Sequence, residues 1–195
     1  IMKEDSSGHD STHIERVWRM AKRIAEIEEC DQFVVEVASL LHDLEDPKLA
    51  FRDKHQVATI LKKYDISMER SQHILEMIAS MSFSSHQKGY RVTTIEGMIV
   101  QDADRMDALG AIGIARTFAY GGSKHRPIYQ GQDDDDSSIA HFYLKLLRLH
   151  SLMNLESSKA IAQERTNRMI LFLDWFHEEW QDDTLIQKTT GGNEQ

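Results

Sequence analysis

The sequence contains only one cysteine, Cys30, so no internal disulfide can form. Because disulfides accompany oxidising compartments, this absence favours a reducing, cytoplasmic setting. No apolar run approaches the roughly 18 residues that a membrane-spanning helix needs. The first residues also lack the apolar core of a signal peptide. We therefore expect no association with a membrane.

Basic residues are in deficit, with 23 lysines and arginines against 32 acidic residues and a formal net charge of −9. Non-specific binding to a nucleic-acid backbone needs a basic face, so this balance disfavours a nucleic-acid polymer as partner. It does not disfavour a small phosphate ester, because a metal ion and a few cations can invert the sign of charge within a pocket.

Proline and glycine are also scarce, with two and ten residues in a chain of 195. Both residue types interrupt regular structure, so their scarcity favours long helices. Apolar residues recur at the three-and-four spacing of amphipathic helices, and no segment shows convincing strand alternation. We predict helices at about 12–27, 31–46, 54–63, 68–81, 93–110, 112–120, 138–153 and 157–181. Asp31 is the expected N-cap of the second, and Thr12 with Glu15 and Thr93 with Glu96 are expected capping boxes.

This pattern predicts an all-α protein, a single compact helical domain over residues 9–181 with no significant sheet. Residues 1–8 and 185–195 are expected to be flexible termini. The helix expected at 93–110 is apolar around most of its circumference, yet it carries Asp102, Asp104 and Asp107. Buried carboxylates need a cation or hydrogen-bond donors beside them, so this helix is a candidate site element.

Two imidazoles and two carboxylates stand out as candidate metal ligands. His13 lies on the first predicted helix, His42 and Asp43 end the second, and Asp104 lies on the buried helix. Such a mixed nitrogen and oxygen set suits Mn²⁺, Fe²⁺, Co²⁺, Ni²⁺ or Mg²⁺ and leaves coordination positions open for catalysis. Taken singly, each residue has an ordinary alternative: His42 as a histidine at a helix end, and Asp104 as a carboxylate satisfied by Arg105 or by a cap.

The ordered set His13, His42-Asp43, Asp104 resembles the H…HD…D signature of the HD-domain superfamily, which implies a helical fold in which these four residues bind one divalent metal ion. The resemblance extends over roughly residues 9–181. It is greatest to a bacterial subfamily of small stand-alone HD hydrolases, some of which are nucleotide pyrophosphohydrolases. The segments that carry it are His13–Val17, Leu40–Asp43, Val100–Ala108, Gly110–Phe118, His141-Phe142 and Lys145–Leu147.

Residues near the ligands also have expected roles, of which the resemblance implies those of Asp46 and Arg116. Asp46 is expected to position the attacking water or transfer a proton, with a plain helix-terminal carboxylate as the alternative. Lys48 and Arg116 are candidates for phosphate contacts. Arg16, one turn after His13, is a second candidate, for which a salt bridge to a nearby carboxylate is equally favoured. Asp107, one turn after Asp104, is expected to orient a ligand histidine from behind.

Together these features predict a divalent-metal-dependent phosphohydrolase, with Mn²⁺ the favoured ion. We expect its substrate to be a small phosphorylated molecule, foremost a nucleoside or deoxynucleoside triphosphate cleaved to pyrophosphate. Three alternatives keep the same site: a phosphomonoesterase, a cyclic-nucleotide hydrolase and an alarmone hydrolase. A fourth is a helical module that binds metal or nucleotide without catalysis. The sequence is compatible with a monomer or a homodimer.

Overall fold

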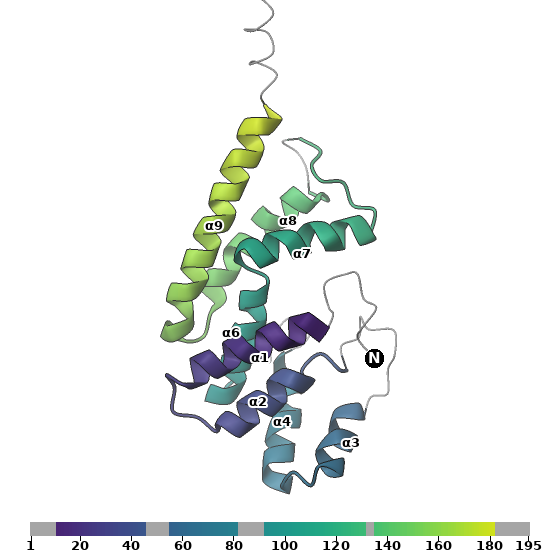
Figure 1. The fold of residues 1–195 in the computed structure, drawn as a ribbon, viewed down its shortest axis with the longest axis vertical. Helices are drawn as coiled ribbons and strands as arrows, with labels where there is room; N and C mark the ends of the chain where they lie inside the picture. Colours follow the sequence, from purple (N-terminus) through teal and green to yellow (C-terminus); the bar gives the residue numbers. More distant parts are fainter. Residues whose placement is uncertain (1–10, 46–54, 82–91, 132–134, 182–195) are drawn as a thin grey trace, which may run out of the picture.

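The computed structural model describes residues 11–45, 55–81, 92–131 and 135–181. Over these ranges the chain is helical and forms no strand, which confirms the predicted fold class. Figure 1 shows two groups of helices, joined where α6 leads into α7. In chain order the elements are α1 Ser11–Ala25, α2 Gln32–Leu41, α3 Gln56–Lys63, α4 Met68–Met81, α6 Ile95–Asp107, α7 Gly110–Ser123, α8 Ser138–Leu144, the 3₁₀ helix η1 Leu146–Leu152 and α9 Glu156–Trp180.

The helices α2 and α8 each begin at a side chain that accepts otherwise unpaired backbone N–H groups. The Asp31 carboxylate accepts from the N–H groups of Phe33 and Val34, which confirms it as the N-cap of α2. The Ser137 hydroxyl accepts from the N–H of Ala140 and caps α8. Both caps satisfy donors that the first turn of a helix leaves free.

The capping box expected at Thr93 is wrong by one residue. The N-cap of α6 is Thr94, whose hydroxyl accepts the N–H of Gly97 at 3.3 Å. Glu96, which was expected to close the box, instead accepts the N–H of Asp31 at 3.0 Å. A contact to a different helix therefore replaces the local one, and it ties the start of α2 to the start of α6.

Other boundaries differ from the sequence prediction as well. The helix expected at 31–46 ends at Leu41 as α2, and residues 42–45 form turns. Thr12 lies within α1, where its hydroxyl accepts from Arg16, and is not the N-cap of that helix. The short helix expected at 112–120 extends over all of α7. The helix expected at 138–153 is divided at Lys145, where α8 ends and η1 begins. Residue spacing does not distinguish an α-helix from a short α-helix followed by a 3₁₀ turn.

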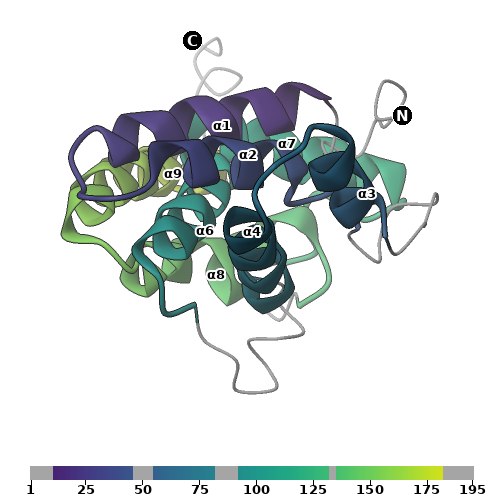
Figure 2. The ribbon, with the colours of Figure 1, turned by 90° about the horizontal axis from the view of Figure 1, so that it is seen from below.

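The first group of helices packs around an aliphatic core. α1 contacts α2 and α6, and α4 contacts α2, α3 and α6. In Figure 2, α1 lies across α2 and α6 on one side of the molecule. Small side chains line this core where the helices meet, among them Ala21, Ala38 and Ala103. Small residues let helix axes approach closely, so polar side chains on these helices can meet at short range.

The second group packs around an aromatic-rich core. α7 and α8 contact each other, α9 contacts α7 and η1, and η1 also contacts α8. Phe142 is completely buried and contacts the rings of Phe118 and Phe172, with ring centroids 6.0 and 5.8 Å away. No helix among the described residues is both long enough and apolar enough to cross a membrane.

The two groups meet at the C-terminal end of α6. Gly110 turns the chain into α7 with a φ of +72°, a conformation that glycine adopts without steric cost. A Cβ at this position would lie 3.2 Å from Cγ of Arg165 on α9, so the corner also permits close approach of α9. Asp104 and Asp107 lie on the last turn of α6, directly before this corner.

Candidate metal centre

His13 brings its imidazole into the interior from the first turns of α1. His13 is 1% exposed, and its Nδ1 lies 2.7 Å from Oδ2 of Asp107. Because a carboxylate accepts hydrogen bonds, this contact favours the tautomer in which Nδ1 carries the proton. The Nε2 lone pair then faces the opposite way, towards Asp43 and Asp104, at 3.2 and 3.5 Å from their nearest oxygens.

His42 and Asp43 lie at the end of α2, where the backbone is no longer held in a regular helix. Nδ1 of His42 lies 2.8 Å from the carbonyl oxygen of Ser39, which can only accept, so this nitrogen donates. The other nitrogen, Nε2, is buried and has no hydrogen-bond partner among the described residues. It points between the carboxylates of Asp43 and Asp104, whose nearest oxygens are 3.4 and 3.8 Å away.

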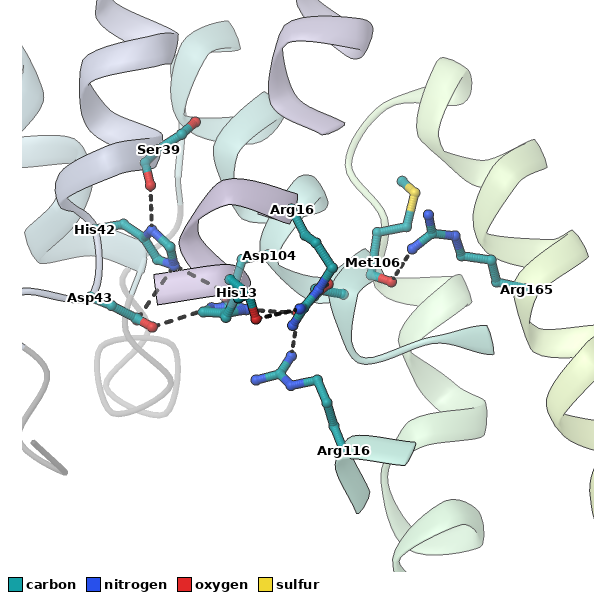
Figure 3. A network of polar contacts seen from close by, with 11 residues as sticks. His13, Arg16, Ser39, His42, Asp43, Asp104, Met106, Arg116 and Arg165 are labelled. Carbon is teal, nitrogen blue, oxygen red and sulfur yellow. Dashed lines mark hydrogen bonds and ion pairs between the residues drawn. The ribbon is translucent and has the colours of Figure 1, made fainter. Parts of the chain in front are cut away.

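The donor atoms are spaced as ligands of one ion are. Atoms of His13, His42 and Asp104 all lie within 4.8 Å of one another, and Asp43 lies within 3.4 Å of both Nε2 atoms. Metal bonds of roughly 2.0–2.2 Å to nitrogen and oxygen set neighbouring ligand atoms about 3–4 Å apart. Figure 3 shows the four side chains converging from α1, the end of α2 and α6. Asp104 is the accessible member, with 43% of its side chain exposed.

The electrostatics of the cluster favour a positive charge at its centre. Burial alone would lower the pKa of His42, but the nearby carboxylates of Asp104 and Asp43 raise it to about 9. Burial alone would also lower the pKa of His13, but Asp107, Asp43 and Asp104 raise it. Desolvation of the Asp104 carboxylate beside its neighbours would raise its pKa, yet its contacts with His42 lower it. A divalent cation at this place would interact favourably with the same carboxylates that stabilise protons on the imidazoles.

Asp107 contacts His13 and two arginines at once. Its Oδ1 accepts from Nε of Arg16 at 2.7 Å, and its Oδ2 accepts from the second terminal nitrogen of Arg16 at 3.0 Å. Oδ2 also accepts from Arg116 on α7 at 2.7 Å. Burial would raise the pKa of Asp107, but His13, Arg16 and Arg116 together hold it well below the usual range. The carboxylate is therefore ionised and fixed by three groups from two other helices.

Among the described residues, the structure brings together the candidates that the sequence singled out for the site. The four candidate ligands and Asp107 form one cluster. Arg16 adopts the salt-bridged arrangement that was one of its two expected roles, and Arg116 makes the same contact from α7. Asp46 and Lys48 lie outside the described residues.

Sequence reasoning missed the contacts that depend on how helices pack. Asp102 was grouped with the candidate carboxylates, but it accepts from the backbone N–H groups of Asn154 and Leu155 at the start of α9. Asp102 therefore accepts backbone N–H groups that the start of α9 leaves unpaired. These hydrogen-bond donors stabilise the buried carboxylate in place of a cation. The roles of Ser39 as the acceptor for His42, and of Arg165 as a donor to the carbonyl of Met106, left no signal in the spacing.

A helical fold that gathers two imidazoles and two carboxylates in this way defines a protein able to hold a catalytic divalent metal ion. Comparison with known proteins gives the family. Residues 10–109 match the HD domain family. The chain is 40% identical over 177 residues to YpgQ of Bacillus subtilis, covering 89% of this chain and 85% of YpgQ.

Solved structures agree with this assignment. A crystal structure of Bacillus subtilis YpgQ in complex with ADP superposes with a TM-score of 0.81 at 39% identity, covering 92% of this chain and 94% of that one. An HD-superfamily hydrolase from Bacillus thuringiensis superposes with a TM-score of 0.76 at 43% identity, covering 93% and 91%. The chain belongs to the HD-domain family and is a metal-dependent phosphohydrolase of the HD type, as the ordered histidines and aspartates predicted.

Proposed function

We propose that the protein hydrolyses nucleoside or deoxynucleoside triphosphates and releases pyrophosphate, using one divalent metal ion, with Mn²⁺ favoured. The observation that carries the proposal is the convergence of His13, His42, Asp43 and Asp104 at ligand spacing, with Asp104 open to solvent. The complex of the relative YpgQ with ADP supports a nucleotide as the substrate class.

The residues behind the ligands prepare the site. Asp107 and the Ser39 carbonyl accept from the Nδ1 atoms of the two histidines, so both Nε2 lone pairs are directed at the centre of the cluster. A divalent ion held there supplies charge for a phosphoryl oxygen and lowers the pKa of a water molecule. Because the protein fixes both imidazoles before any ligand arrives, little reorganisation is needed when the substrate binds.

The arginines on Asp107 are suited to neutralise the substrate phosphates. Arg16 and Arg116 share one carboxylate between two guanidinium groups, so the three side chains together carry a net positive charge. Arginine matches phosphate oxygens in a bidentate manner, and anchoring by Asp107 reduces the entropy lost on binding. Asp46, as the group that positions water or moves a proton, and Lys48, as a phosphate contact, complete the proposed machinery.

The test is product analysis with Mn²⁺-loaded protein and a panel of nucleoside triphosphates, monophosphates and cyclic nucleotides. We expect pyrophosphate and a monophosphate from the triphosphates, and a loss of about 10³-fold or more in His42→Ala. His125→Asn is the matched control, because His125 is exposed and its φ of +55° is tolerated by asparagine.

Full activity in His42→Ala would exclude the proposed metal site. Products from monophosphates or cyclic nucleotides alone would keep the site and replace the substrate. No product from any nucleotide, with metal bound, would exclude nucleotides as substrates.

A further inference from the structure

A cavity of about 260 Å³ lies between α1, α6, α7 and α9, and Arg16 and Asp107 are among the residues that line it. Four arginines line it, three from α1 and one from α9: Arg16, Arg19, Arg23 and Arg165. The three on α1 follow the three-and-four spacing that places residues on one helix face. In a chain with a net charge of −9, this concentration of positive charge on one cavity is the opposite of the overall balance.

The carboxylates around this cavity do not pair with all four arginines. Arg16 is paired with Asp107, and Arg19 with Glu15. Arg23 makes no hydrogen bond or ion pair with any other residue that the structure describes. Arg165 donates to the carbonyl oxygen of Met106, a neutral acceptor, at 2.7 Å.

The surroundings of Arg165 show that the positive charge is in excess. Its side chain is half-buried, and burial is the main cause of its lowered pKa; the charges of Asp107 and Glu164 oppose this lowering, and those of Arg168 and Arg23 reinforce it. Of these cations only Arg23 also lines the cavity, so its charge and that of Arg165 repel each other there. An anion placed among them relieves both the repulsion and the cost of burial.

The size of the cavity selects the kind of anion. It is smaller than the roughly 300–1,000 Å³ of pockets that enclose a whole drug-sized ligand. A phosphate or diphosphate group fits this space and offers several oxygens to several guanidinium groups. The opposite wall includes the apolar side chain of Ile112, which gives no competing charge.

We propose that the cavity lined by Arg16, Arg19, Arg23 and Arg165 is a second anion site, which binds inorganic phosphate or pyrophosphate apart from the metal ligands and shares Arg16 with the phosphate contacts proposed above. Asp107 connects the two places, since it contacts both His13 and Arg16. The proposal does not depend on which nucleotide, if any, is hydrolysed, and it is tested by binding and not by turnover.

The experiment is calorimetric titration of the full-length chain with inorganic phosphate and with pyrophosphate, in the Mn²⁺-loaded protein and again after removal of the metal. The variants are Arg23→Gln and the double variant Arg19→Gln/Arg23→Gln, both at exposed positions. Arg148→Gln, an exposed arginine on η1, is the control for an equal change in net charge. Thermal unfolding of each variant checks that it is folded.

We expect phosphate binding that persists without metal and weakens about ten-fold in Arg23→Gln, and further in the double variant, as expected for loss of charged hydrogen bonds. Arg148→Gln should bind as the wild type does. A parallel titration with ADP identifies the source of the anion. Equal weakening assigns the site to the phosphates of a nucleotide, and unchanged ADP binding assigns it to the free anion.

Three results would overturn the proposal: no phosphate binding by the metal-free wild type, unchanged binding in the double variant, or equal weakening in Arg148→Gln. The last would indicate a general effect of charge with no dependence on the cavity.

Discussion

The two halves of the molecule are built from different side chains, and only one of them carries the candidate metal ligands. The core under α1, α2, α4 and α6 is aliphatic wherever the structure describes it. The core under α7, α8 and α9 instead contains phenylalanine rings packed on one another at centroid distances of about 6 Å, such as Phe118, Phe142 and Phe172.

The difference follows from what each half must bring together. Histidine and aspartate side chains are short, so residues on three elements can meet within 4.8 Å only if the helices lie close to one another. Alanines on α1, α2 and α6 allow that approach. The aromatic half contributes no ligand among the candidates. It positions Arg116 and Arg165 behind α6, and so acts as a support for the site.

The largest effect that tests this separation is expected from Phe142→Ala. Phe142 is 0% exposed, and removing a buried phenylalanine costs about 3–5 kcal/mol through lost burial and the cavity left behind. Urea unfolding should show this loss, while Mn²⁺ affinity, measured where the variant is folded, stays within a factor of about three, roughly 0.65 kcal/mol.

Trp175→Ala on α9 is the control for Phe142→Ala, because Trp175 is 62% exposed and should cost less than about 1 kcal/mol. A parallel loss of metal affinity in Phe142→Ala would show that the two halves are not separable.

The second largest effect is expected from Asp107→Asn, because Asp107 joins His13 of the first group of helices to Arg116 of the second. An amide in place of the carboxylate cannot accept from His13, Arg16 and Arg116 together, so His13 loses its fixed orientation. Loss of such a supporting carboxylate typically weakens metal affinity about 10–100-fold. Calorimetric titration with Mn²⁺ measures it, and Asp174→Asn, exposed on α9, is the matched control. Unchanged affinity would remove Asp107 from the metal centre.

The smallest effect is a pH dependence that belongs to the aromatic half. Burial, and then the charges of Lys145 and Arg126, lower the pKa of His141 to about 4, from about 6.5 in an unfolded chain. The unfolded state therefore binds the proton first as pH falls. The contribution of His141 to stability is complete above pH 6.5 and is lost between pH 6.5 and 4.

The test for His141 compares the free energy of unfolding at pH 7 and pH 4.5 in the wild type and in His141→Asn, with metal removed from both. The wild type should lose on the order of 1–2 kcal/mol more than the variant. Identical losses would mean that His141 does not titrate in this way.

Helix positions and candidate ligands could be predicted from the sequence because both depend on local order along the chain. The spacing of apolar residues predicted α4 with both of its ends, Met68 and Met81, and the capping preference of aspartate predicted the Asp31 cap. The ordered histidines and aspartates indicated which residues to bring together, although no one of them was convincing alone.

The remainder could not be predicted because it depends on contacts between helices. Thr94 takes the place of Thr93 as the cap of α6, and Glu96 bonds to the start of α2 in place of closing a capping box. Asp102 and Asp107 lie on the same helix and have the same chemistry, yet one satisfies the start of α9 and the other holds His13. The contacts that α6 makes with the start of α9 and with α1 separate these two roles.

The central claim is that side chains from α1, the end of α2 and α6 hold one divalent ion. Calorimetric titration of Mn²⁺ into metal-free wild type and His42→Ala, with His125→Asn as control, tests it most directly. We predict one ion per chain for the wild type and the control, and an affinity at least about 100-fold lower in His42→Ala, because a buried ligand nitrogen is lost. Binding of one ion with unchanged affinity by His42→Ala would contradict the account.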